Sequence, residues 1–526
     1  MATAAPFKLT YSTMFDPPAE LHQRFDAALA AFRQHGMGRS WPHWIGGKAV
    51  AGQGEFEGRS PIDRDWLLGR YARGDAQVAD AAVQAARAAW PGWAATPWRQ
   101  RVALLRRAAR LIEERVYAIS AAVALEVGKN RMESLGEVQE TADLFDWYCD
   151  QMEAHDGFDR PLPDDPLAGY VSHNRSVLKP YGVWVVIAPF NFPVALAGGP
   201  LAPALVAGNT VVVKGGEDTT LSTWLLIECL RDAGLPDGVV NLVCGDGEHV
   251  GAPLAAHPQV AGLTFTGSHA VGMGLLRQSV AGRWPRPFIA EMGGKNATIV
   301  SRHGDLERAA LGIMRSSFGL SGQKCSACSR VYVEQPVAAE LRERLVALTE
   351  KIAVGDPTLQ PNWMGPVINT AAQQRYRRLA EHLHAAGQVF TGGRVLEEGA
   401  LARGWFVAPT VATAPLDDAA WVDEHFLPLV LVGEVASVDE GIARANASEL
   451  GLTAGFYGTP EEVWHFHQHI EAGVTYANRP QGATTGAWPG YQPFGGWKGS
   501  GTTGKAIGSF YYLPQYLREQ SQTVVA

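Results

Sequence analysis

The chain has 526 residues, of which 46% are hydrophobic and 19% charged, and its net charge at pH 7 is −8. This length predicts two or three lobes, each with a sizeable core. The scattered Lys and Arg exclude the dense basic surface that nucleic-acid binding requires. The most apolar run, residues 183–192, is half the length of a membrane-spanning helix, so we expect no membrane span.

Cysteine usage and the N-terminus indicate the compartment. Five cysteines are too few and too scattered for a disulfide framework. Residues 1–15 lack the basic stretch and sustained apolar core of a secretory signal. We therefore expect a cytoplasmic protein.

Helical and strand-like patterns follow one another along the chain. Residues 76–118 are alanine-rich with helical periodicity, which predicts packed amphipathic helices. After a polar stretch at 156–165, apolar runs at 183–188, 210–214, 239–243 and 263–266 alternate with helical segments such as 220–233. A second set of strand-like runs lies at 297–300, 331–333, 411 and 429–432. This alternation predicts two α/β lobes, each with a parallel sheet.

Asn191 lies in Ala188-Pro189-Phe190-Asn191-Phe192-Pro193, directly after a strand-like run. Two prolines restrain the backbone there and hold a polar side chain among apolar neighbours. A buried amide needs hydrogen-bonding partners, which favours a functional role. The alternative is an asparagine that only forms a turn.

Gly267 and Ser268 close a strand-like run, and Gly272 follows within the first turn of the next helical segment. Backbone N–H groups at such a helix N-terminus can bind a pyrophosphate. Two glycines alone are weak evidence, but the segment Val211 to Glu217 precedes them by two elements and strengthens the prediction of a dinucleotide site.

Cys325, in Gly322-Gln323-Lys324-Cys325-Ser326, follows Glu291, in Glu291-Met292-Gly293-Gly294-Lys295-Asn296, by 34 residues. A thiol attacks a carbonyl only as the thiolate, and a nearby carboxylate can take its proton through a water and later activate that water. The pair predicts covalent catalysis on a carbonyl. Cys325 and Cys328 also form a C-x-x-C, but zinc needs further ligands that the sequence lacks, so we expect no metal.

These segments resemble, in order and spacing, the aldehyde dehydrogenase family over nearly the whole chain. The resemblance implies an α/β fold with two Rossmann-type lobes and a small oligomerisation hairpin. It implies an NAD-binding domain at 1–156 and 179–290, a catalytic domain at 291–506, and a hairpin and tail at 157–178 and 507–526. A homo-oligomer, at least a dimer, is implied as well. From the residues alone, the tail is equally consistent with docking on its own chain and with adding an edge strand to a neighbouring subunit.

The resemblance also assigns site residues. It implies that Cys325 is the nucleophile, that Asn191 stabilises the oxyanion and that Glu291 activates the deacylating water. NAD, with NADP as the alternative, would be held by Lys214, Glu217, Gly267, Ser268, Gly272, Glu424 and Phe426. A carboxylate such as Glu217 accepts from a free ribose hydroxyl and repels a 2′-phosphate, which favours NAD. The chain departs from the family pattern at Gly215, in place of proline, and at Leu427, in place of glycine.

Three segments, 322–330, 478–483 and 492–496, resemble the subfamily that oxidises L-glutamate γ-semialdehyde, the aldehyde related to Δ1-pyrroline-5-carboxylate, to L-glutamate in proline breakdown. This implies that the substrate carboxylate is held by Ser326 and by the N–H groups of Gly482 and Ala483. Phe494 would pack on the aliphatic chain and Glu140 would face the ammonium group. Two alternatives stay open: a dehydrogenase for another short aliphatic or carboxylated aldehyde, and a cofactor-binding scaffold without turnover.

Overall fold

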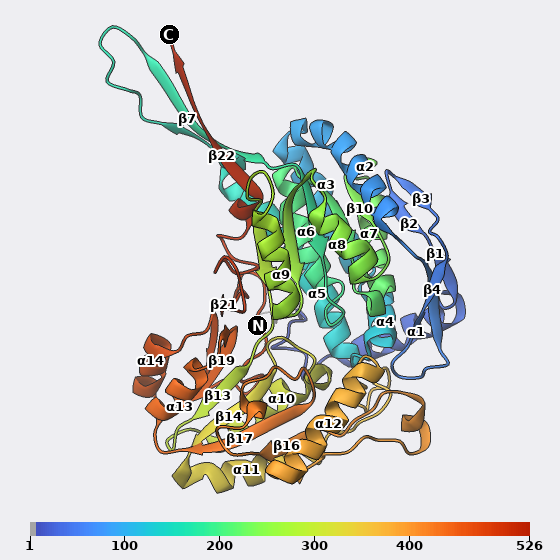
Figure 1. Ribbon diagram of the computed structural model, residues 1–526, viewed down its shortest axis with the longest axis vertical. Helices are drawn as coiled ribbons and strands as arrows, with labels where there is room; N and C mark the ends of the chain where they lie inside the picture. The colour runs from blue at the N-terminus through green and yellow to red at the C-terminus, as the bar shows by residue number, and fades with distance from the viewer. Residues whose placement is uncertain (1–6) are drawn as a thin grey trace, which may run out of the picture.

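The computed structural model describes residues 7–526, and its two largest sheets have seven strands each (Figure 1). The first sheet has the order β12-β11-β8-β9-β10-β2-β3. Its strands from β12 to β10 are parallel, whereas β2 and β3 run antiparallel at one edge. Their bounds are β2 (His43–Ile45), β3 (Lys48–Val50), β8 (Val183–Ile187), β9 (Thr210–Lys214), β10 (Val240–Leu242), β11 (Val260–Thr266) and β12 (Phe288–Glu291).

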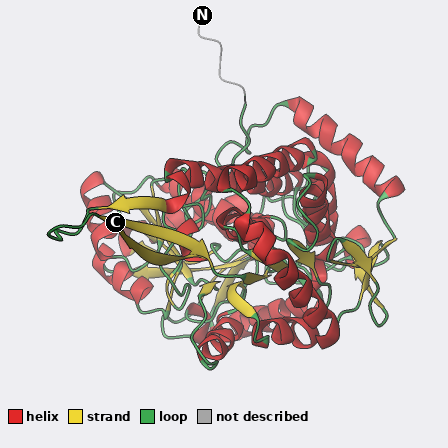
Figure 2. Ribbon diagram, turned by 90° about the horizontal axis from the view of Figure 1, so that it is seen from above, coloured by secondary structure: helices red, strands yellow, loops and turns green. Residues whose placement is uncertain are grey.

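Helices lie on both sides of the strands (Figure 2). The alanine-rich region predicted as helical forms α2 (Ala76–Ala95), α3 (Trp98–Glu114) and α4 (Val116–Val127), which confirms that prediction. Asp75 starts α2 by accepting hydrogen bonds from two N–H groups of its first turn. The other helices of this lobe are α1 (Ala19–His35), α5 (Arg131–Ala154), α6 (Ala195–Ala207), α7 (Thr220–Asp232), α8 (Ala252–Ala256) and α9 (His269–Val280).

The second sheet has the order β15-β16-β17-β14-β13-β19-β20 and is parallel except for β15. Its strands are β13 (Asn296–Val300), β14 (Cys328–Glu334), β15 (Gln388–Thr391), β16 (Thr410–Thr413), β17 (Leu429–Val435), β19 (Thr453–Tyr457) and β20 (Val474–Ala477). It is covered by α10 (Leu306–Phe318), α11 (Gln335–Thr349), α12 (Thr370–Ala386), α13 (Val438–Asn446) and α14 (Pro460–His469). The predicted pair of α/β lobes is thus confirmed.

A three-stranded antiparallel sheet projects from the body (Figure 1). It contains β6 (Asp159–Leu162), β7 (Ser172–Pro180) and the C-terminal β22 (Leu517–Val525). β22 pairs with β7 of its own chain, from Leu517 opposite Pro180 to Val525 opposite Ser172. The tail therefore docks on its own hairpin. Residues 507–516 differ from the expected tail, because Tyr512 and Tyr516 are buried in the main core.

The remaining strands form two small sheets. One contains β1 (Arg39–Trp41), β4 (Glu55–Arg59) and β5 (Leu67–Ala72), and the other contains β18 (Leu450–Gly451) and β21 (Trp497–Lys498). Within residues 7–526, no helix is both long enough and apolar enough to cross a membrane. All five cysteines lie in this part of the chain and are free thiols. The prediction about residues 1–15 falls in part on residues 1–6, which lie outside the described residues.

Candidate active site

Two cavities meet at Cys325, which lines both. The larger cavity has a volume of about 560 Å³ and the smaller one about 90 Å³. Cys325 follows the short helical turn η4 (Gly319–Gly322), in which Leu320 and Ser321 have left-handed φ values of 50° and 53°. Non-glycine residues in this region cost free energy and are common at functional sites. The thiol is thus accessible from two sides and lies on a constrained segment.

The larger cavity opens at the carboxyl ends of β8, β9 and β11. Lys214 ends β9, and Gly267 and Ser268 follow β11; all three line the cavity. Ser268 accepts from the Val271 N–H at 3.5 Å and so caps α9. A helix N-terminus beside a cationic side chain attracts anions, so this wall fits the pyrophosphate of a dinucleotide. Ligand cavities at this edge of a parallel sheet are the general rule.

Two further residues that the resemblance assigns to the cofactor, Gly272 and Glu217, are not among those that line the larger cavity. Gly272 is buried beneath Met292, and a Cβ there would lie 2.4 Å from the Met292 sulfur. It therefore permits close packing of α9 rather than contact with a ligand. Glu217 is exposed at the start of the turn after β9, beyond the wall that Lys214 lines. Burial lowers the pKa of Lys214, and the nearby Glu217 partly offsets this.

The segment around Glu424 forms the opposite wall. One Glu424 oxygen accepts from the Gly294 N–H at 2.8 Å, and burial raises the pKa of this carboxyl. Phe426 adopts a left-handed φ of 57°, and its ring meets that of Phe190 edge to face at 5.9 Å. Because Phe426 and not Leu427 has the positive φ, leucine is tolerated where the family pattern has glycine. The other departure, Gly215, is buried and closely packed: a Cβ there would lie 2.5 Å from the Thr223 hydroxyl.

Charges and burial keep the Cys325 thiol protonated. Burial raises its pKa to about 12, and the carboxylates of Glu424 and Glu291 contribute further. Glu291 ends β12, is buried, and accepts from the Gly496 N–H at 3.0 Å. Burial raises the pKa of Glu291 well above its ordinary value. A protonated thiol beside weakly acidic carboxyls can pass its proton to one of them when a carbonyl is attacked.

Asn191 reaches across from the segment after β8. Its side-chain amide donates to the Gln323 carbonyl at 3.0 Å, two residues before Cys325. The thiol of Cys328, the second cysteine of the C-x-x-C, lies 3.2 Å from the Thr298 hydroxyl inside the second lobe. The structure therefore brings Asn191 to the Cys325 segment, while Cys328 packs within the second lobe.

The smaller cavity is lined by side chains of both charges. Glu140, Ser326 and Phe494, which the resemblance assigns to the substrate, line it. Glu133, Arg315 and Lys324 line it as well. One Glu140 oxygen accepts from the Tyr11 hydroxyl at 2.7 Å, and burial raises the pKa of Glu140 to about 8. A small cavity with two carboxyl groups and two cationic groups suits a short ligand that carries both charges.

The family to which this protein belongs is shown by matches that span most of the chain. The model of the aldehyde dehydrogenase family matches residues 49–521. The chain belongs to this family. It is 36% identical over 527 residues to a 1-pyrroline-5-carboxylate dehydrogenase of Anoxybacillus flavithermus, covering 99% of both chains. A 1-pyrroline-5-carboxylate dehydrogenase of Geobacillus kaustophilus is 36% identical over 512 residues, covering 95% of this chain and 96% of the relative.

A solved structure agrees with the fold. The crystal structure of a Thermus 1-pyrroline-5-carboxylate dehydrogenase with bound NAD superimposes with a TM-score of 0.92 at 33% identity, covering 99% of both chains. The expectation of an aldehyde dehydrogenase fold is thus confirmed.

The predicted anchor at Gly482 and Ala483 is wrong in position. Ala483 is buried, and its N–H donates to the Gly312 carbonyl at 3.0 Å, so it is not free for a ligand. The smaller cavity is lined instead by Gly486 and Ala487. The sequence contains two Gly-Ala pairs four residues apart, and only folding shows which one reaches the cavity.

Sequence reasoning also missed Tyr11, Phe15, Glu133 and Arg315. These residues lie far apart along the chain and belong to no pattern with a known chemistry. Tyr11 and Phe15 come from the segment before α1 and close one side of the smaller cavity.

Proposed function

We propose that this aldehyde dehydrogenase oxidises L-glutamate γ-semialdehyde, the aldehyde related to Δ1-pyrroline-5-carboxylate, to L-glutamate with NAD. The observation that carries the proposal is a single accessible thiol between a dinucleotide-sized cavity and a small cavity of mixed charge. The names of the relatives support the same substrate.

Cys325 is the proposed nucleophile. Its sulfur forms a bond to the aldehyde carbon, and the thiol proton leaves through a water towards Glu291. Asn191 then donates to the oxyanion: its amide has two hydrogens, and the Gln323 carbonyl uses only one of them. The larger cavity, lined by Lys214, Ser268 and Glu424, would hold NAD, which would supply the hydride acceptor for the oxidation.

Glu291 completes the reaction. One of its oxygens accepts from Gly496, which leaves the other, once the thiol proton has been released to solvent, to take a proton from water. A carboxyl with a raised pKa is a stronger base once ionised. The water attacks the thioester carbon, the carbon–sulfur bond breaks, and the acid is released with the Cys325 thiol restored.

The charges of the smaller cavity support the choice of substrate. Glutamate γ-semialdehyde carries an ammonium and a carboxylate group. Ser326 and the backbone of Gly486 and Ala487 would bind the carboxylate, and Glu140 would bind the ammonium, since all four residues line this cavity. Successive N–H groups at a glycine turn form such an anion site. Phe494 would contact the aliphatic part.

The residues in and beside the larger cavity support the proposed cofactor site. Lys214 and Glu217 would bind the adenosine ribose, the start of α9 the pyrophosphate, and Glu424 with Phe426 the nicotinamide riboside. The NAD bound to the Thermus relative supports NAD over NADP. In domain terms, the first sheet would carry the cofactor and the second the nucleophile.

The projecting sheet suggests an oligomer, at least a dimer. Tyr170, Val171, Val524 and Val525 are exposed apolar residues on or beside β7 and β22. An uncovered apolar surface of this kind marks an association site. The free thiols support a reducing compartment such as the cytoplasm.

The test is NAD reduction with pyrroline-5-carboxylate, succinate semialdehyde, propanal and betaine aldehyde. We expect kcat/KM to be highest for pyrroline-5-carboxylate, by about tenfold or more given its two extra charged contacts. Cys325→Ala serves as the blank. A preference for another aldehyde would contradict the substrate assignment and keep the chemistry, whereas no turnover at all would contradict both.

A further inference from the structure

Helix α5 carries two buried carboxylates one turn apart, Glu133 and Glu137, and each pairs with a buried lysine. The Lys129 ammonium lies 2.5 Å from one Glu137 oxygen, and both side chains are fully buried. Lys324 pairs with Glu133 in the same way. Neither Lys129 nor Glu137 lines the larger or the smaller cavity.

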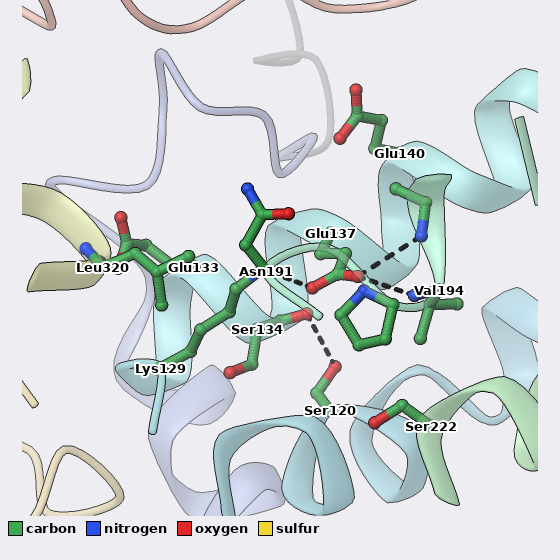
Figure 3. Close-up of polar contacts among 12 residues, drawn as sticks. Ser120, Lys129, Glu133, Ser134, Glu137, Glu140, Asn191, Val194, Ser222 and Leu320 are labelled. Carbon is green, nitrogen blue, oxygen red and sulfur yellow. Dashed lines mark hydrogen bonds and ion pairs between the residues drawn. The ribbon is translucent and has the colours of Figure 1, made fainter. Parts of the chain in front are cut away.

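Glu137 binds the segment that carries Asn191 (Figure 3). Its second oxygen accepts from the N–H groups of Val194, at 2.8 Å, and Ala195, at 3.3 Å, at the start of α6. Lys129 lies 3.4 Å from the centre of the Phe192 ring, the residue next to Asn191. The ion pair therefore contacts residues 192–195 through a backbone cap and through an aromatic ring.

Glu133 binds the segment that carries Cys325. One oxygen pairs with Lys324, the residue directly before the thiol, and the other accepts from the Leu320 N–H at 3.1 Å. The Asn130 side chain also donates to this carboxylate at 3.1 Å. Glu133 thus contacts the strained turn and the residue adjacent to Cys325.

The two segments come from different lobes, since Asn191 follows β8 of the first sheet and Cys325 precedes β14 of the second. A single rigid helix contacts both. Burying charge pairs has a free-energy cost, and apolar residues of similar size often stabilise a fold at least as much. Stability alone is therefore a weak reason for two such pairs on one helix.

We infer that Glu137, with Lys129, is a positioning residue that fixes the Asn191 amide relative to the Cys325 thiol, and that Glu133 does the same for the Cys325 segment. The inference rests on the proposed roles of Asn191 and Cys325. Glu137 contacts the backbone of residues 194–195, so its effect falls on the segment that carries Asn191. Because Phe192 and Ala195 also line the smaller cavity, the KM for NAD, and not that for the aldehyde, is the binding constant that should stay unchanged.

The test is Glu137→Gln, which keeps the size of the side chain but leaves Lys129 without a countercharge. A displacement of about 1 Å costs on the order of a hundredfold in rate, so we expect kcat to fall about 10- to 100-fold. The KM for NAD and the rate of Cys325 alkylation by iodoacetamide should stay within about twofold, because neither needs an oxyanion donor. Glu133→Gln should instead change the alkylation rate.

Glu126→Gln is the matched control. Glu126 is a buried carboxylate that accepts from the Leu221 and Ser222 N–H groups at the start of α7, so the partners it binds belong to neither catalytic segment. Its Tm should fall while kcat stays near the wild-type value. If Glu137→Gln does not fold, Glu137→Asp keeps the charge, moves the carboxylate and should show the same fall in kcat.

Three results would overturn the inference. An unchanged kcat in folded Glu137→Gln or Glu137→Asp contradicts it and leaves the proposed function intact, as does a kcat loss matched by Glu126→Gln. No aldehyde turnover by the wild-type enzyme contradicts the proposed function and this inference together.

Discussion

The two cavities that meet at Cys325 are built in different ways. The larger one lies where parallel strands of the first sheet end, and its wall includes residues at strand ends and helix starts, such as Lys214 and Ser268. The smaller one is assembled from the segment before α1, from α5 and from the segment 481–494. The first depends on local geometry that a sequence encodes, the second on long-range packing. Substrate specificity is therefore harder to predict from the sequence than cofactor binding.

Replacing the residue that both cavities share should have the largest effect. In Cys325→Ala, kcat should fall at least about a thousandfold, as for other nucleophile deletions. Binding of NAD, measured by calorimetry, should stay within about threefold, because the larger cavity keeps its other walls.

Cys328→Ala is the matched control for this substitution. That thiol is buried against Thr298 and should lower Tm with little change in kcat. Turnover by Cys325→Ala near the wild-type rate would mean that another group is the nucleophile.

Gly486→Ala should affect the smaller cavity alone. Gly486 has a φ of 111°, and a Cβ there would lie 2.5 Å from the Arg479 guanidinium. Strain of about 1–3 kcal/mol should raise the KM for the aldehyde about tenfold, while the KM for NAD is unchanged. Gly54→Ala has a similar φ of 117° in open space and serves as the control. An equal rise in both KM values would show that the two cavities do not bind their ligands independently.

Glu424→Gln should affect the larger cavity alone. The glutamine carbonyl can still accept from Gly294, but one charged acceptor for a ribose hydroxyl is lost. Such a bond contributes about 1 kcal/mol, so the KM for NAD should rise about fivefold in steady-state assays. A rise in the KM for the aldehyde instead would mean that Glu424 belongs to the other site.

Glu140 provides a test of the smaller cavity through pH. Its raised pKa, about 8, means that the folded protein binds a proton that the unfolded chain has lost. Its contribution to stability is therefore greatest at low pH and declines as pH rises towards 8. The Tm of the wild type should fall relative to Glu140→Gln between about pH 5 and 9, by the equivalent of a few kcal/mol. Parallel Tm curves would show that Glu140 is ionised in the folded state.

Particular residues show how far sequence reasoning reaches. Runs such as 183–187 and 210–214 are valine-rich and bounded by turn residues, so their place in a parallel sheet could be predicted, and with it the site of Lys214. The positions of Glu291, Cys325 and Asn191 followed from motif and spacing, although their roles stay predictions. The edge strands β2 and β3 were not predicted, since three-residue strands carry no clear periodicity.

The smaller cavity could not be predicted for a physical reason. Tyr11 contacts Glu140 across 129 positions, and no local pattern encodes that contact. The choice between Gly482-Ala483 and Gly486-Ala487 depended on which N–H groups were already bonded within the protein. Gly272 was misjudged because a glycine needed for packing and one needed for a ligand look alike in a sequence.

The segment before α1 has a practical consequence for how this enzyme should be produced. Tyr11 and Phe15 close one side of the smaller cavity, so a fusion placed directly before Tyr11 would adjoin a wall of the proposed aldehyde site. β22 lies instead at the edge of the projecting sheet (Figure 1), and none of its residues lines either cavity. Substrate profiles are best measured on protein without a fusion next to Tyr11, and self-association on protein without a fusion next to β22.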